Sequence, residues 1–183
     1  MRRLLFALLI IPFSFSAVNA KQKEFNSGLV YGEHHAFFVS APAGWVLDNG
    51  SAAVDGVHAA FYPVGGSWKS SMAVMYANGV DKQDDETLDH FIDGDVEKFS
   101  IDTPEIKIED AEFPSLPNKT MRAKRFSKDS NGIEMVVYID EPKSVSMIVL
   151  SAHSRESFER SYQAFKDLVK SYKFMTSDVR IKK

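Results

Sequence analysis

Two neighbouring segments in the C-terminal half constrain the fold more than any other feature of the sequence. Residues 133–140 and 145–152 each carry apolar side chains on both faces of an extended chain, and the turn Glu141-Pro142-Lys143-Ser144 separates them. A strand that is apolar on both faces is typical of the middle of a sheet, where both faces are covered. The sequence therefore predicts two central strands joined by a short turn.

Shorter strand-like runs accompany these two segments. They lie at residues 36–41, 45–48, 57–62, 71–77, 105–113 and 120–127. The pair Asn131-Gly132 is the kind of sequence that a two-residue hairpin turn prefers. Because short turns separate consecutive runs, we predict a mainly antiparallel sheet of about six or seven strands.

Two segments change from strand to helix periodicity. The first carries an apolar stripe at Leu88, Phe91, Ile92, Val96 and Phe99, after three carboxylates at residues 84–86 that favour a helix start. The second has Ser154 as its predicted N-cap and an apolar stripe at Phe158, Tyr162, Phe165, Val169 and Tyr172. The resulting order, β-β-β-α-β-β-β-β-α, predicts a single α+β domain with two principal helices packed on the sheet.

The first twenty residues are typical of a cleaved export signal. Arg2 and Arg3 precede an apolar run at residues 4–15, and Val18-Asn19-Ala20 ends in a small residue suited to cleavage before Lys21. The apolar run is shorter than a membrane span requires, so we expect no stable membrane anchor after cleavage. We divide the rest into a flexible lead-in (21–35), the α/β domain (36–175) and a basic tail (176–183).

Charge and cysteine content limit the function further. Loss of Arg2 and Arg3 with the signal changes the formal net charge from −3 to −5, which argues against a nucleic-acid partner. The chain has no cysteine, so it forms no disulfide and carries no lipid-attachment cysteine. We expect a bacterial periplasmic protein, with secretion as the alternative.

The motifs, taken in order, resemble the PsbP-like superfamily, which includes bacterial DcrB-like proteins. The segments that carry the resemblance are FFVSAPAGW, AFYPVGGSW, MAVMYA, VVYID with SMIVLSA, and FERSYQAFKDLVKSYKF, which span residues 36–174. The resemblance implies an α/β/α sandwich and a role in binding, assembly or stabilisation. The chain lacks the lipid-attachment cysteine of DcrB-like lipoproteins and shows no sign of a photosynthetic partner. The resemblance therefore assigns no functional residue of PsbP to a position in this chain.

Signatures of catalysis are weak. The sequence has no thiol, no G-x-S-x-G elbow and no S-x-x-K pair, and Ser154 next to His153 is better explained as a helix cap. No cofactor and no metal site is predicted, since neither His34-His35 nor the acidic run 81–97 has the spacing of a known site. The acidic run could instead dock a basic partner.

Two tryptophans receive different interpretations. Trp45 follows the turn Pro42-Ala43-Gly44 and is expected to be a packing anchor rather than a ligand platform. Trp68 lies on a glycine-rich loop, where it could contact a partner or fold back onto the sheet. Trp68, Lys69 and Tyr62 are therefore the predicted binding residues.

The leading hypothesis is an exported, non-enzymatic binding, assembly or stabilising domain of the cell envelope. It would bind a protein or another envelope component through the loops around Trp68 and the acidic first helix. One alternative is a hydrolase or metal-dependent enzyme whose site assembles from distant residues such as His58, His90 and His153. The other is a small-ligand carrier with a pocket between sheet and helix.

Overall fold

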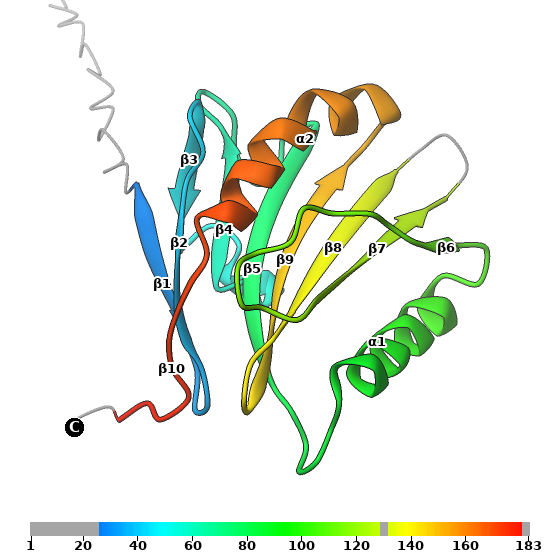
Figure 1. Ribbon diagram of the computed structural model, residues 1–183. Coiled ribbons are helices and arrows are strands. Elements are labelled where there is room, and N and C mark those ends of the chain that lie inside the picture. The colour runs from blue at the N-terminus through cyan, green and yellow to red at the C-terminus, as the bar shows by residue number, and fades with distance from the viewer. Residues whose placement is uncertain (1–25, 129–131, 181–183) are drawn as a thin grey trace, which may run out of the picture.

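A seven-stranded antiparallel sheet forms the centre of the molecule. The computed structural model describes residues 26–128 and 132–180 (Figure 1). In their side-by-side order, the strands of this large sheet are β3 (Trp45–Asp48), β4 (Ala59–Pro63), β5 (Ala73–Asp81), β9 (Ser144–Ala152), β8 (Ile133–Asp140), β7 (Met121–Ser127) and β6 (Lys107–Asp110). Every neighbouring pair is antiparallel.

The prediction of two central strands is confirmed. Strands β8 and β9 pair with each other along their whole length, and β9 also pairs with β5 while β8 pairs with β7. Their residues on both faces are mostly buried, as in Val136 and Val137. Apolar side chains on both faces therefore require a covering layer on each side of the sheet.

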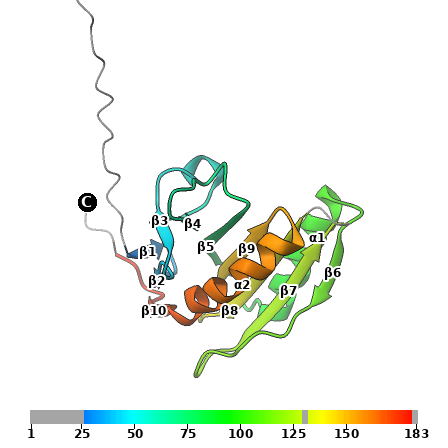
Figure 2. The same cartoon turned by 90° about the horizontal axis from the view of Figure 1, so that it is seen from above.

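Two helices supply much of these layers. Helix α1 (Leu88–Asp102) covers one face and helix α2 (Arg155–Lys170) covers the other, so the molecule is an α/β/α sandwich (Figure 2). Under α2, Phe158, Phe165 and Leu168 pack into the main core with residues of β5, β8 and β9. Under α1, Leu88 and Ile92 pack against the opposite face of the sheet. The predicted α+β class is thus confirmed.

The helix starts follow the local sequence. The side chain of Ser154 accepts a hydrogen bond from the backbone N–H of Ser157, 3.2 Å away, as the predicted N-cap of α2. In α1 the N-cap is Thr87, whose hydroxyl accepts from the N–H of His90. The carboxylates at 84–86 lie just before this cap.

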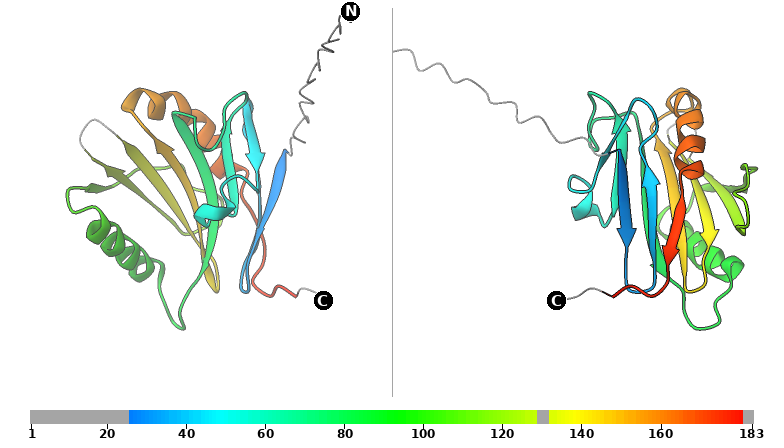
Figure 3. Two further views of the ribbon diagram at one scale, coloured as in Figure 1. Left: turned by 180° about the vertical axis from the view of Figure 1, so that it is seen from behind. Right: turned by 60° about the vertical axis from the view of Figure 1, so that its left-hand side comes forward.

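A second, smaller sheet was not predicted. It has three antiparallel strands in the order β1 (Ser27–Tyr31), β2 (Ala36–Ser40) and β10 (Lys173–Thr176). Figure 3 shows these strands side by side next to α2. Residues 27–31, expected in a flexible lead-in, and residues 173–176, expected around the end of the domain, are thus ordered strands. Strand β10 pairs with β2 across a large sequence separation, which local patterns do not show, whereas β1 pairs with β2 in a short hairpin.

The inner face of the small sheet completes the main core. Val30, Phe37 and Val39 are at most 1% exposed and belong to the same core as Phe165 of α2. The layer on this face of the large sheet therefore consists of α2 together with the small sheet.

The turn before Trp45 has the expected form. The N–H of Trp45 donates to the C=O of Pro42, 3.0 Å away, and Gly44 has a φ of 79° that favours glycine. Trp45 packs, partly buried, against the main core, in agreement with the anchor interpretation.

Some expectations fall outside the described part of the chain. The export signal lies there entirely, and Asn131 of the predicted hairpin turn does as well. Across residues 26–128 and 132–180, neither helix combines the length and the apolar character that crossing a membrane demands.

Candidate functional site

Apolar side chains gather on the solvent-facing side of the small sheet. We call this surface the outer face, and its exposed fractions are 43% for Leu29, 53% for Tyr31, 37% for Phe38 and 57% for Met175. Leu29 lies directly opposite Phe38 in the ladder, and Phe38 lies opposite Lys173 of β10. An antiparallel sheet usually presents polar side chains to water on its open face. A gathering of apolar side chains on such a face is typical of an interaction surface.

Strand periodicity explains why these residues point outward. In β1 and β2 successive side chains alternate between faces, so Val30 and Phe37 enter the core while Leu29 and Phe38 face solvent. Both faces of these strands are therefore apolar, but the structure covers only one.

The backbone of β1 is also available along one edge. The N–H of Gly32 donates to the C=O of His35 across the hairpin, 2.9 Å away. Because hydrogen-bonded and non-bonded pairs alternate, Val30 bonds to Phe37, whereas the backbone groups of Leu29 and Tyr31 point to the free edge.

This edge lacks the protection that two other edge strands, β6 and β10, carry. Strand β6, at one end of the large sheet, carries the charged residues Lys107, Glu109 and Asp110. Strand β10 has a register irregularity between Phe174 and Thr176. Strand β1, SGLVY, has no charge, proline or bulge, which are the usual devices against edge pairing.

A groove of about 500 Å³ lies beside β1. The three successive residues Leu29, Val30 and Tyr31 line it on one side, and the other lining residues come from the segment after β3, namely Asn49, Ala53, Gly56, Val57 and His58. Successive residues of a strand point to opposite faces, so a groove lined by all three runs along the strand edge. The groove thus places the outward backbone groups of β1 next to open space.

Trp68 packs against the segment that lines the groove opposite β1. Its ring is half-buried against Ala52, Val57 and Tyr76, and its Nε1–H donates to Oδ2 of Asp55, 2.8 Å away. Asp55 ends the short helix η1 (Ala53–Asp55) within the segment that lines the groove. Trp68 therefore folds back and holds this segment in place while part of its ring stays accessible.

The other two predicted binding residues differ in accessibility. Lys69 is exposed, whereas Tyr62 is buried on β4 and donates from its hydroxyl to Oδ2 of Asp48, 2.8 Å away. Partner binding by Trp68 and Lys69 stays a prediction. Because Tyr62 is buried, it would affect binding only by stabilising the fold around Asp48.

Asp48 is the most strongly shifted carboxyl near this region. Burial pushes its pKa upward, but hydrogen bonds from the N–H groups of Ser51 and Gly50 and from Tyr62 lower the pKa to about 2. Asp48 therefore acts as a charged acceptor that shapes the chain between β3 and η1.

The histidines proposed for a distant-residue enzyme site do not converge. His58 donates from its backbone to the side chain of Asn78, near one end of β5, whereas His153 donates to Met72, just before the other end. His90 lies on α1, in the opposite layer. These three histidines therefore do not form the catalytic site that the enzyme alternative requires.

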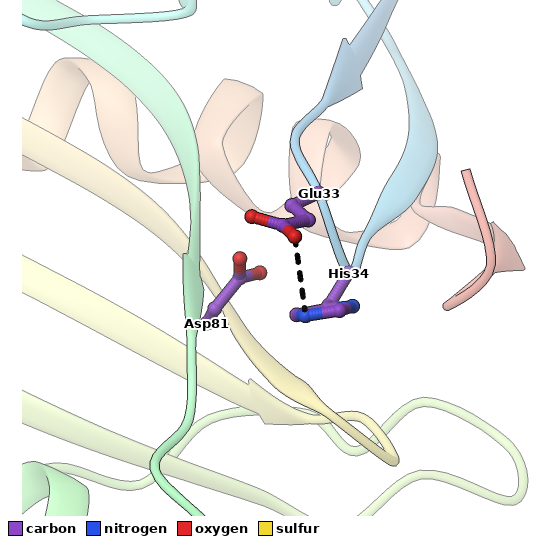
Figure 4. A group of neighbouring side chains, drawn as sticks. All are labelled: Glu33, His34 and Asp81. Carbon is purple, nitrogen blue, oxygen red and sulfur yellow. Dashed lines mark ion pairs between the residues drawn. The ribbon is translucent and has the colours of Figure 1, made fainter. Parts of the chain in front are cut away.

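A different group of metal-ligating side chains does come together. Over the described residues, one group of three such side chains is close enough to share an ion, namely Glu33, His34 and Asp81 (Figure 4). Their ligand atoms lie within 4.8 Å of one another. Glu33 and His34 form the turn between β1 and β2, and Asp81 ends β5.

His35 lies behind this group. It is 3% exposed, and its Nδ1 lies 2.8 Å from Oδ1 of Asp81. Its ring stacks on His58, with centroids 6.4 Å apart. Partial burial and, secondarily, the neighbouring His35 lower the pKa of His58. Of the two adjacent histidines, His34 is thus half-exposed and His35 is buried.

The carrier alternative predicted a pocket between sheet and helix. The space beneath α2 is filled by Phe158, Phe165, Leu168 and Val169. Open grooves lie at its borders, including one of about 380 Å³ between Trp45 and the start of α2. These grooves are surface features rather than enclosed ligand sites.

Comparison with known proteins extends the fold assignment. No protein-family model matches the chain, and no curated protein matches it. Among solved structures, the cyanobacterial PsbP protein (CyanoP) of Synechocystis is 11% identical, covers 82% of this chain and 93% of its own, and has a TM-score of 0.54. The Ran-binding protein Mog1p of Saccharomyces cerevisiae is 11% identical, covers 83% of this chain and 95% of its own, and has a TM-score of 0.51.

A mutant of Mog1 gives a similar result, with 13% identity, coverage of 84% and 97%, and a TM-score of 0.52. The chain therefore has a PsbP/Mog1-like fold. At these identities the likeness concerns the fold alone.

Proposed function

We propose that this chain is an exported, non-enzymatic domain of the bacterial cell envelope that binds a protein partner through the outer face of the small sheet. The observation that carries the proposal is the exposure of Leu29, Tyr31, Phe38 and Met175 on one open sheet face. Burial of apolar surface is the main driving force of most protein association.

The free edge of β1 indicates how the partner would bind. An extended segment laid along this edge would pair with the outward backbone groups of Leu29 and Tyr31. Its side chains on the solvent-facing side would then cover part of the outer face. Backbone pairing would supply register, and the apolar contacts would supply selectivity.

The structural neighbours are compatible with this role. One of them is described as a Ran-binding protein, so the fold serves a protein-binding function in that case. The export signal and the envelope location are part of the proposal and come from the sequence of residues 1–20.

A paired substitution tests the proposal. Leu29→Lys places a charge in the outer face, whereas Ile101→Lys makes the same kind of change at a 70% exposed residue of α1, in the opposite layer. Circular dichroism and thermal unfolding first establish that both variants fold. In a pull-down from envelope extract, we expect the wild type and Ile101→Lys to retain the same protein and Leu29→Lys to lose most of it.

Equal retention by both variants would contradict the proposed surface. The same pull-down with Trp68→Ala examines the prediction that Trp68 and Lys69 contact the partner. Loss with Trp68→Ala but not with Leu29→Lys would move the binding site to the Trp68 loop.

A further inference from the structure

We propose that Glu33, His34 and Asp81 form a site for a divalent transition-metal ion, with zinc as the best-suited ion. The site lies at the tip of the β1–β2 hairpin, where it meets the end of β5 (Figure 4). It is independent of the proposed protein-docking function, because it uses other side chains.

The spacing of the donor atoms suits a single ion after small side-chain movements. The donor atoms lie within 4.8 Å of one another, and Nε2 of His34 lies 4.0 Å from Oε1 of Glu33. Ligand atoms about 2.0–2.2 Å from a tetrahedral zinc ion are separated by roughly 3.4 Å. The Glu33 side chain is 84% exposed and the His34 side chain 42%, so rotation of these two can close the difference.

The charge of the group favours a cation. Glu33 and Asp81 bring two carboxylates close together, and like charges at this separation repel. Among the described residues, the ion-pair partners of these two carboxylates are histidines, and no lysine or arginine lies within 4.0 Å of either. A divalent ion would neutralise both carboxylates at once.

A hydrogen bond from the buried His35 ring holds the Asp81 carboxylate in position. An ionised carboxylate only accepts hydrogen bonds, so Nδ1 of His35 donates to Oδ1 of Asp81 and leaves Oδ2 for an ion. The ring fits because two glycines face it, since a Cβ on Gly32 or on Gly79 would lie 2.3 Å from a ring atom. A ligand carboxylate that is oriented by a buried hydrogen-bonding side chain is common at metal sites.

The donor set selects the class of ion. One imidazole nitrogen and two carboxylate oxygens suit zinc and its first-row neighbours, whereas calcium prefers six or more oxygen ligands. Three protein ligands leave the fourth tetrahedral position of zinc open to water or to a side chain of another molecule.

Isothermal titration of zinc chloride into the purified protein, prepared without a polyhistidine tag, tests the site. We expect one zinc ion per chain, with affinity reduced at least about tenfold in His34→Ala and in Glu33→Gln. The matched control is His90→Ala, which removes an exposed histidine on α1 and is expected to leave the affinity unchanged.

Asp81→Asn is a third test variant, but it also alters the bond to buried His35 and could impair folding. Glu33→Gln avoids this difficulty because Glu33 is exposed at the hairpin tip. Absence of saturable zinc binding, or equal affinity in the wild type, His34→Ala and Glu33→Gln, would overturn the proposal. Loss of binding in His90→Ala alone would place the ion elsewhere.

Discussion

The hydroxyl of Tyr172 donates a hydrogen bond to Oε1 of Glu141, 2.8 Å away, and so ties the chain after α2 to the turn between β8 and β9. Glu141 is 4% exposed, and Nζ of Lys119 lies 2.5 Å from the same oxygen. Ser146 completes the group, with its hydroxyl 2.9 Å from that of Tyr172. Because Tyr172 immediately precedes β10, this buried group positions the small sheet that carries the proposed docking surface.

Removal of the Tyr172 hydroxyl should therefore destabilise the protein. Tyr172→Phe leaves the buried Glu141 carboxylate with one donor fewer, and we expect the free energy of unfolding to fall by about 1–3 kcal/mol. Urea denaturation followed by circular dichroism measures the change. Tyr162→Phe is the control, since the contacts of Tyr162 with Phe113, Phe158 and Lys166 are made by its ring and are kept by phenylalanine. Equal losses in the two variants would contradict the role given to Glu141.

Asp48 should contribute stability that depends on pH. Although burial opposes it, hydrogen bonding lowers the pKa of Asp48 from 3.8 to about 2 in the folded protein. A lowered folded-state pKa means that the stabilisation is complete above about pH 4 and is lost as the pH falls towards 2. We expect Asp48→Asn to lower the free energy of unfolding at pH 7 by about 1–2 kcal/mol, allowing for solvent screening.

Unfolding of Asp48→Asn and wild type, compared at several pH values between 7 and 2.5, tests this expectation. The difference between the two should shrink as the solution becomes more acidic. A difference that stays constant over this range would show that the charge of Asp48 is not what stabilises the turn.

Gly79 and His35 should be energetically coupled. A methyl group on Gly79 would meet the His35 ring at 2.3 Å, so Gly79→Ala is expected to cost about 1–3 kcal/mol of stability. His35→Ala removes the ring and should make the alanine at position 79 better tolerated. A double-mutant cycle by thermal or urea unfolding measures the coupling. Additive effects of the two substitutions would mean that the ring is not held against Gly79.

The elements of the large sheet and both helices could be predicted from the sequence because their patterns are long and local. Strand β8 repeats apolar residues on both faces over eight positions, and α2 carries a clear apolar stripe. Ser154 could be identified as a cap because a serine before an apolar helical stripe has a specific local role.

The small sheet could not be predicted in this way. Strands β1 and β10 have only five and four residues, and β10 pairs with β2 from the opposite end of the domain, which local sequence does not reveal. The large apolar side chains of β1, Leu29 and Tyr31, face solvent, so hydrophobicity gives no clue to the orientation of this strand.

The candidate sites show the same limit. The metal-ligating group joins Glu33 and His34 to Asp81, nearly fifty residues further along the chain, through the packing of the small sheet against β5. Because Asp81 approaches Glu33 and His34 only in the folded protein, the sequence contains no ligand-spacing motif that would predict the site. A role for Trp68 in binding, in contrast, is predicted from its loop position and stays a prediction, and the structure adds that its Nε1–H donates to Asp55.

Site-specific photo-cross-linking tests the central claim of protein docking most directly. A photoreactive amino acid replaces Leu29, Phe38 or Ile101, one at a time, in cells that produce the protein, and adducts are identified in the envelope fraction after irradiation. Leu29 and Phe38 lie opposite each other on the outer face, while Ile101 on α1 is more exposed than either of them. We expect the same protein adduct from positions 29 and 38 and none from position 101. Adducts from position 101 alone, or none from positions 29 and 38, would contradict the claim of docking.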